Sequence, residues 1–244
     1  DTEIAIVEMG ANHQKEIQFL CEIAEPDFGY ITNFGKAHLE GFGGVDGVIK
    51  GKSELYDYLT KNKKSIFFNA DDSIQINKLK NYSKKYGFSS INSKYYRIEL
   101  EEVQPFVIIK VEDSIIHSNL IGAYNFHNCC AAIIVGKYFN VELTEIKIAL
   151  EKYTPENNRS QIIQKNDHYI ILDAYNANPS SMKVALENFK ALKKTNKVLI
   201  LGDMFELGNS AEAEHQTITD LTKTLQFENV LFVGENFYRT HTNS

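Results

Sequence analysis

The sequence predicts an α/β protein: a mostly parallel sheet with an antiparallel ribbon attached, followed by a second, smaller α/β domain. Two observations predict this class. Short apolar runs such as IAIVEM (4–9) and YITNF (30–34) alternate with helical patterns such as QKEIQFLCEIAE (14–25), and such alternation is typical of parallel sheets. Between residues 89 and 120 the pattern changes to closely spaced strands with turns between them, which predicts the ribbon.

The first half of the chain repeats a strand-and-helix rhythm. Val48, Tyr56 and Leu59 fall on one face of an amphipathic helix that starts near Val45. The run SIFFNADD (65–72) then precedes a second helical pattern at 73–87. The ribbon strands follow as YYRIELEEV (95–103), FVIIKVED (106–113) and SIIHSNL (114–120), and two helices follow them at 125–139 and 143–153.

A polar linker, TPENNRS (154–160), separates this region from a second α/β rhythm. Beyond the linker we expect strands in HYIILDAY (168–175), KVLILGDM (197–204) and NVLFVG (229–234), with helices that begin at Pro179 and at residue 211. Pro179 suits a first helical turn, where its missing N–H is not needed. We therefore predict two domains, residues 1–157 and 158–244.

Composition is that of an ordinary globular protein. The 244 residues are 43% hydrophobic and 24% charged, so a large core can be buried. No apolar run reaches the roughly 18–20 residues that span a bilayer, and a net charge of -6 argues against a nucleic-acid surface. The three cysteines, Cys21, Cys129 and Cys130, have no Cys-x-x-Cys spacing. We expect a cytoplasmic protein that binds neither membrane nor nucleic acid.

The stretch DGVIKGKSELY (46–56) contains Gly-Lys-Ser, the residues that close a phosphate-binding P-loop. A P-loop requires a glycine where this chain has Asp46, and it follows a buried strand, whereas Lys52 lies within the amphipathic helix. Lys52 is thus either a solvated helix residue or, if a metal ion lies beside it, a candidate for carbamylation. Carbon dioxide would convert its amine into an anionic oxygen ligand.

Polar side chains follow several predicted strands, where ligands gather in open α/β sheets. Each could also be a strand-end cap or turn former. Glu8 and His38 are of the types that hold a hard divalent ion, although no compact metal-binding spacing joins them. The residues at these strand ends are Glu8, Asn33, His38, Asp173, Asp203 and Glu206.

The loop DAYNANPSSM (173–182) is the most unusual stretch. Asp173 closes an apolar strand, and Tyr175, Asn176 and Asn178 crowd the segment before Pro179. Such a loop offers side-chain amides and a helix N-terminus to a polar or anionic ligand. An asparagine-rich turn that caps a helix is the alternative interpretation.

Taken together and in order, six stretches resemble the Mur ligase family. The last two point to those members that add D-alanyl-D-alanine to UDP-N-acetylmuramoyl-tripeptide. The six are EMGANHQKEI (8–17), ITNFGKAHLEGFGG (31–44), KGKSELY (50–56), GAYNFHNCCAA (122–132), DAYNANPSSM (173–182) and LGDMFELG (201–208).

The resemblance implies a site for ATP and two magnesium ions. Glu8 matches the glutamate on the ion that bridges the ATP phosphates, and His38 matches the histidine on the second ion. Lys52 matches the carbamylated lysine that completes this second site, so Lys52 and His38 are the implied catalytic residues. The remaining implied contacts are Asn125 and Asn128 at adenine, Arg159 near the phosphates, Asp173 at the ribose, and Tyr175, Asn176 and Asn178 in a loop over the reaction centre.

Two positions depart from the family's pattern. Tyr124 stands where the family usually has histidine, and Arg159 lacks the glycine that commonly precedes it. The family's Gly-Lys-Thr loop is also absent before Glu3, so we expect a chain truncated at both ends that is inactive by itself. Its two regions would be a central ATP-binding domain and a Rossmann-like C-terminal domain.

The implied activity is ATP-dependent amide-bond formation through an acyl phosphate, in cytoplasmic synthesis of peptidoglycan precursors. We expect a monomer that acts on small molecules. Two alternatives stand beside this interpretation. One is another amide ligase of the family, or an enzyme like folylpolyglutamate synthase. The other is a nucleotide-binding module without catalysis.

Overall fold

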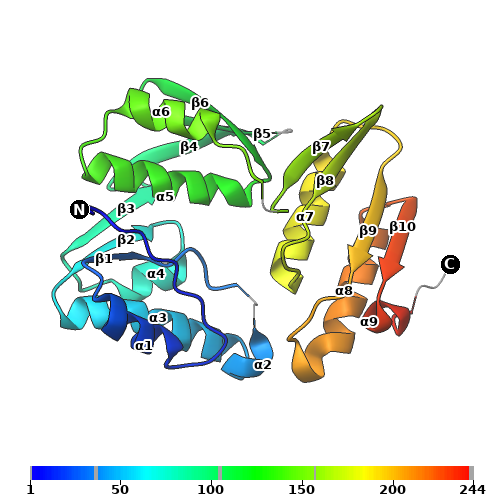
Figure 1. Cartoon of the computed structure of the whole chain (residues 1–244), viewed down its shortest axis with the longest axis horizontal. Helices are drawn as coiled ribbons and strands as arrows, with labels where there is room; N and C mark the ends of the chain where they lie inside the picture. Colours follow the sequence, from blue (N-terminus) through cyan, green and yellow to red (C-terminus); the bar gives the residue numbers. More distant parts are fainter. Residues whose placement is uncertain (1, 36–37, 104–105, 157, 242–244) are drawn as a thin grey trace.

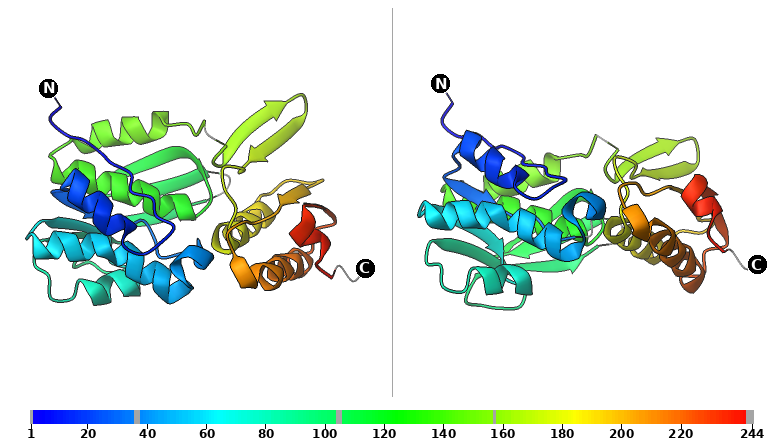
Figure 2. Two further views of the ribbon diagram at one scale, coloured as in Figure 1. Left: turned by 60° about the horizontal axis from the view of Figure 1, so that its bottom comes forward. Right: turned by 90° about the horizontal axis from the view of Figure 1, so that it is seen from below.

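The computed structural model of the chain describes residues 2–35, 38–103, 106–156 and 158–241. We call residues 2–156 the N-terminal part and residues 158–241 the C-terminal part. Residue 157, where the predicted domain boundary falls, lies outside the described residues. The N-terminal part has helices on both faces of one sheet (Figure 1), and Figure 2 shows the C-terminal part beside one end of it.

The sheet of the N-terminal part has its strands in sequence order from β1 to β6. β1 to β4 pair in parallel, whereas β4, β5 and β6 pair antiparallel, which confirms the predicted ribbon. The strands are β1 (Phe28–Tyr30), β2 (Ser65–Asn69), β3 (Lys85–Ser89), β4 (Tyr96–Glu102), β5 (Phe106–Val111) and β6 (Ser114–Ile121).

Helices cover both faces because the central strands are apolar on both sides, as in other parallel sheets. Phe67 of β2 packs in the cluster that holds Cys129, Cys130 and Ile133 of α5, whereas its neighbours Ile66 and Phe68 pack against α3 and α4. No helix in the described ranges is long and apolar enough to cross a membrane. The helices are α1 (Glu16–Ala24), α2 (Leu39–Phe42), α3 (Val45–Lys61), α4 (Ser73–Lys78), α5 (Tyr124–Tyr138) and α6 (Leu143–Lys152).

The run IAIVEM does not form the predicted strand. No described residue from 2 to 10 pairs with a strand, and Ile4, Ile6 and Val7 are 59%, 93% and 60% exposed. A strand needs a neighbour for its backbone hydrogen bonds, and this run has none among the described residues. The prediction was therefore wrong about this segment's structure, although not about its apolar character.

Two other predicted boundaries also differ. The helix predicted at 73–87 ends at Lys78, because Lys85 to Phe88 pair with β2 as a parallel strand and Phe88 is buried there. β1 ends at Tyr30, before the end of the run YITNF, and Asn33 follows the strand in a loop, as predicted.

Two glycines one turn apart on α3 let α2 pack at close range. A Cβ at Gly47 would lie 1.8 Å from the carbonyl oxygen of Phe42, and one at Gly51 would lie 2.4 Å from the Phe42 ring. Phe42 is buried. Gly51, the glycine of the Gly-Lys-Ser stretch, is thus a packing residue inside a helix, and the P-loop interpretation of Lys52 is excluded.

The C-terminal part contains two separate strand pairs. β7 (Gln161–Lys165) and β8 (His168–Leu172) form an antiparallel hairpin, while β9 (Val198–Gly202) and β10 (Asn229–Val233) pair in parallel. Leu199 and Leu201 pack inward against Leu186 and Ile218. The helices are α7 (Pro179–Ala191), the 3-10 turn η1 (Gly208–Ser210), α8 (Ala211–Thr224) and α9 (Glu235–Tyr238).

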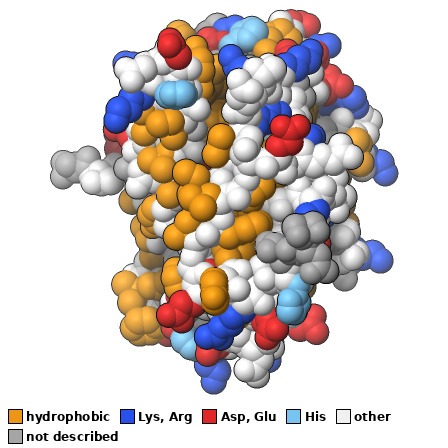
Figure 3. All heavy atoms as spheres, turned by 90° about the vertical axis from the view of Figure 1, so that its right-hand side faces the viewer, with side chains coloured by type: hydrophobic (Ala, Val, Ile, Leu, Met, Phe, Trp, Pro, Cys, Tyr) orange, Lys and Arg blue, Asp and Glu red, His pale blue; other side chains and the backbone are white. Residues whose placement is uncertain are grey.

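The outer face of the β9–β10 pair is apolar and open to solvent. Val198, Ile200, Leu231 and Val233 alternate with the inward-facing residues and are 58%, 70%, 56% and 51% exposed. Figure 3 looks onto this side of the molecule and shows hydrophobic side chains gathered in a band. We refer to these four residues as the outer strand face.

Gly47→Ala should lower the free energy of unfolding by roughly 1–3 kcal/mol, because the added methyl group overlaps the backbone of buried Phe42. Lys50→Ala, on the exposed side of the same helix, is the matched control and should change it by less than about 0.5 kcal/mol. Urea unfolding followed by circular dichroism measures both values. Equal transition midpoints for the two variants would contradict the close approach.

Candidate functional site

The first turns of α5 bring together two of the side chains predicted to contact a nucleotide. Asn125 is buried, and its Nδ2 donates to the carbonyl oxygen of Ile121 at 2.8 Å. Its Oδ1 accepts from Nδ2 of Asn128 at 3.0 Å. The exposed Asn128 is therefore held in place by a buried amide, which fixes the orientation of a polar group at the surface.

The linker between the two parts is fastened by Tyr124 and Asp173. The Tyr124 hydroxyl hydrogen-bonds to that of Ser160, and the Ser160 N–H donates to Oδ1 of Asp173 at 3.0 Å. Ser160 is buried and has a φ of 50°, a left-handed conformation that costs free energy in a residue with a side chain. Ser160 could not be identified from the sequence, because its partners lie 36 and 13 residues away and no local pattern marks it.

The loop after β8 is held both by its own side chains and by residues of the linker. Oδ1 of Asn176 accepts from the Ala177 N–H at 2.8 Å. Asn178 and Ser181 form a reciprocal capping box at the start of α7, which supports the helix-cap interpretation for Asn178. Arg159 lies over the exposed ring of Tyr175, 3.9 Å from its centroid. This contact brings two of the predicted site residues together and holds the guanidinium of the linker against the loop after β8.

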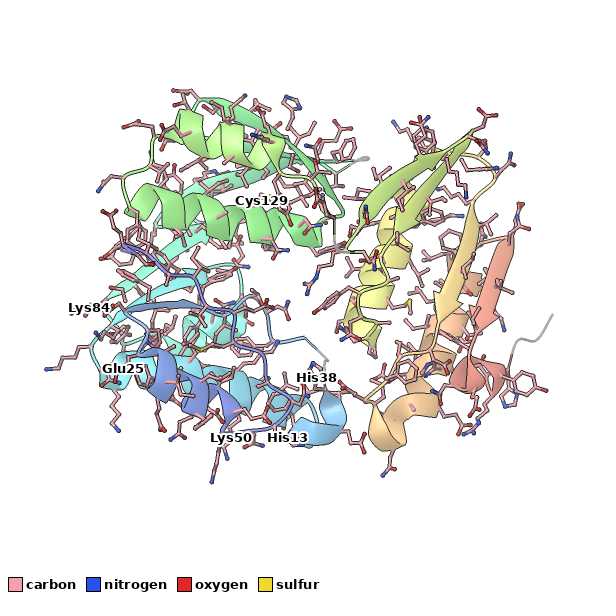
Figure 4. The ribbon with its side chains drawn as sticks, viewed as in Figure 1. His13, Glu25, His38, Lys50, Lys84 and Cys129 are labelled. Atoms are coloured by element: carbon pink, nitrogen blue, oxygen red, sulfur yellow. The ribbon has the colours of Figure 1, made fainter. Side chains whose placement is uncertain are left out.

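Lys52 points back toward the loop after β1. Its Nζ donates to the carbonyl oxygen of Asn33 at 2.8 Å, and burial lowers the pKa of its amine. Two residues earlier, Lys50 lies on the outside of α3 (Figure 4). Lys52 is therefore not a solvated helix lysine, and more of its amine is neutral at a given pH than for an exposed lysine.

His38 faces the C-terminal part from the start of α2 (Figure 4). Its Nδ1 contacts Oε2 of Glu206, which lies in the loop after β9, and the Glu40 N–H donates to the carbonyl oxygen of Glu206 at 3.4 Å. A cleft of about 510 Å³ lies beside this contact. Its lining residues include Leu39, Glu40, Gly43, Leu207, Gly208 and Ser210.

The described residues do not bring the predicted metal ligands into one cluster. Glu8 is exposed on the unpaired N-terminal segment, and no group of three or more His, Cys, Asp or Glu side chains among the described residues could hold a metal ion. By type of donor, His38 and a carbamylated Lys52 would suit a hard divalent ion. The geometry gives Glu8 no such support.

Comparison with known proteins gives matches over both parts of the chain. Residues 1–136 match the Mur ligase middle domain, and residues 158–243 match a second family described as Mur ligase, glutamate ligase domain. The UDP-N-acetylmuramoyl-tripeptide--D-alanyl-D-alanine ligase of Bacillus subtilis (strain 168) is 32% identical over 222 residues, which cover 88% of this chain and 48% of that protein. The chain spans about half the length of the curated relatives that it matches.

Two solved structures share the fold. MurF from Acinetobacter baumannii has a TM-score of 0.81 and 29% identity, with 93% of this chain and 51% of that chain covered. MurF ligase from Thermotoga maritima, solved in complex with ADP, has a TM-score of 0.78 and 20% identity, with 94% and 54% covered. These similarities confirm the predicted α/β fold class.

Asp173→Ala should speed hydrogen exchange of the Ser160 amide roughly five- to tenfold, because it removes a hydrogen bond worth about 1 kcal/mol. Asp167→Ala, in the exposed turn of the β7–β8 hairpin, is the control and should leave this amide unchanged. Exchange followed by NMR gives both rates. Unchanged exchange in the Asp173 variant would show that the carboxylate does not hold the linker.

Proposed function

The chain belongs to the Mur ligase family, and from this premise we propose that it carries the nucleotide-binding and C-terminal domains of a ligase that joins D-alanyl-D-alanine to UDP-N-acetylmuramoyl-tripeptide. The observation that carries the proposal is the similarity to relatives of that name across both matched segments. Residues 1–157 and 158–244 would be the two domains, and the reaction would use ATP in the cytoplasmic synthesis of peptidoglycan precursors.

The nucleotide would lie between the start of α5 and the linker. Asn125 and Asn128 would frame the adenine, and Asp173 would accept from a ribose hydroxyl while its other oxygen keeps Ser160 in place. Arg159 would supply positive charge near the phosphates. Three contacts support this arrangement: Asn128 with Asn125, Ser160 with Asp173, and Arg159 with Tyr175. The neighbour from Thermotoga maritima was solved with ADP, which is consistent with a nucleotide here.

Magnesium would be held by His38 and by a carbamate on Lys52, and Glu8 is proposed, from the resemblance alone, for the other of the two ions. When bound, magnesium neutralises charge that moves between phosphate and carboxylate oxygens. The lowered pKa of the Lys52 amine supports carbamylation, because only the neutral amine reacts with carbon dioxide. The carbamate nitrogen keeps one N–H, which would still be able to donate to the Asn33 carbonyl oxygen.

The reaction would proceed in two transfers. A carboxylate of the nucleotide-linked peptide attacks the γ-phosphorus of ATP, and ADP leaves as the acyl phosphate forms. The amine of D-alanyl-D-alanine then attacks the acyl carbon, phosphate leaves and the amine loses a proton. Tyr175 and Asn176 would lie on the side of the incoming amine, and Asn178 would act there by fixing the start of α7. Contact between the two parts would exclude water from the acyl phosphate.

The direct test is an assay of the complete protein that contains this sequence. With ATP, magnesium, D-alanyl-D-alanine and a UDP-N-acetylmuramoyl-tripeptide bearing lysine or diaminopimelate, we expect a pentapeptide product and one phosphate per product. L-Alanyl-L-alanine is the control and should give no product. Product formation with glutamate and a folate instead would favour the folylpolyglutamate alternative, and nucleotide binding without any ligation would favour the non-catalytic module.

Lys52 should become a carbamate in the presence of bicarbonate. With ¹³C-bicarbonate we expect a carbamate resonance in the ¹³C spectrum that Lys52→Arg abolishes, because arginine has no amine of suitable pKa. Lys50→Arg, on the outside of the same helix, should leave that resonance in place. A resonance that survives Lys52→Arg would assign the carbamate to another amine.

A further inference from the structure

The loop of residues 203–207 carries one exposed carboxylate to a fixed place opposite His38. Glu206 has a φ of 60° and His38 a φ of 53°, so both residues of this contact have left-handed backbone. This conformation is uncommon for residues with side chains, and it persists where the surrounding structure enforces it. Residues in such conformations cluster at functional sites in proteins.

The loop is fastened on both sides of Glu206. Met204 and Leu207 are buried in the core of the C-terminal part, and the Met204 N–H donates to Nε2 of His215 at 3.0 Å. The Asp203 carboxylate accepts from the N–H groups of Asn236 and Phe237, each at 3.0 Å. The Glu206 backbone is therefore held by buried and hydrogen-bonded neighbours.

Stability alone does not account for this contact. The side chains of His38 and Glu206 are 28% and 53% exposed, and ion pairs with such access to solvent contribute little to folding. The small free energy that this ion pair contributes does not offset the cost of two residues in left-handed conformation. The contact is better explained by what it does to the imidazole ring.

An ionised carboxylate can only accept a hydrogen bond, so the nitrogen of a neutral imidazole that it contacts must carry the ring's one proton. Glu206 contacts Nδ1 of His38, which leaves the lone pair on Nε2. This is the arrangement by which proteins prepare metal-binding histidines: a carboxylate holds one ring nitrogen, and the other faces the ion.

We propose that Glu206 is a positioning residue, which fixes the tautomer and the orientation of the His38 ring. The proposal rests on the proposed function, in which His38 faces magnesium. Because Glu206 belongs to the C-terminal part, His38 is prepared as a ligand only when the two parts are in contact. Contact between the two parts thereby determines whether the His38 ring has the orientation and the tautomer that bind a metal ion.

The test reads the tautomer directly. The 244-residue chain with ¹⁵N-labelled histidine side chains is studied by two-bond ¹H–¹⁵N correlation at a pH above 8, where ordinary imidazoles are neutral, and His38→Asn assigns the signal. We expect wild-type His38 to carry its proton on Nδ1. Glu206→Ala should shift it toward the Nε2–H form, and Glu206→Gln, whose amide oxygen still accepts, should retain the Nδ1–H form.

Glu228→Ala, at an exposed position of the same part, is the control and should leave the His38 signal unchanged. Backbone ¹H–¹⁵N spectra of every variant show whether it is folded. A wild-type Nε2–H form, or the same tautomer in folded Glu206→Ala, would overturn the proposal.

In the complete protein, Glu206→Ala should also lower kcat by about 10- to 100-fold, the usual effect of removing such a partner, and Glu206→Gln should restore part of it. An unchanged kcat in Glu206→Ala would overturn the proposal. The tautomer measurement needs neither metal nor substrate. A complete protein without ligase activity would therefore refute the proposed function and leave the assigned hydrogen bond standing, whereas full ligase activity with the wrong tautomer would refute only the role of Glu206.

Discussion

The close approach of α2 to α3 is the constraint on which the relation between the two parts depends. Gly47 and Gly51 leave room for the backbone and ring of Phe42, and this seats α2 against the start of α3. Leu39, Phe42 and Val48 then join the same buried cluster as Leu186 and Leu201. The C-terminal part therefore completes its core with side chains from the N-terminal part, and His38 is placed by the same packing.

Among the described residues, two regions of contact between the two parts differ in chemistry. Around the linker the contacts are polar and directional, from Tyr124 through Ser160 to Asp173. Around α2 an apolar cluster carries the contact between His38 and Glu206 at its edge. Apolar packing supplies area without fixing an angle, whereas hydrogen bonds fix geometry and contribute less free energy. The apolar region thus supplies buried area, and the polar region fixes the relative orientation of the two parts.

Local patterns in the sequence were sufficient to predict most elements but not the contacts that build the site. The helices at Glu16–Ala24 and Ala211–Thr224 follow from apolar periodicity, which is a property of the segment itself. The strand at residues 4–9 could not be settled in this way, because a strand depends on its neighbour. The contacts of Ser160 and of Lys52 are made with residues far away in the chain, so no local pattern predicts them. The roles of the candidate residues came from resemblance, and for Asn178 the structure adds a cap that the sequence also allowed.

The outer strand face bears on how the isolated chain should be handled in the laboratory. This face presents four aliphatic side chains on two adjacent strands, and Phe205, which follows β9 in the sequence, is 72% exposed. Exposed apolar surfaces of this kind are those through which proteins associate nonspecifically. The substitutions Ile200→Thr and Leu231→Thr would place a β-branched residue, which strands favour, at each position. Each would also add a hydroxyl group that is exposed to solvent. Because the core lies on the other face of these strands, such changes offer a route to concentrated samples without disturbing the fold.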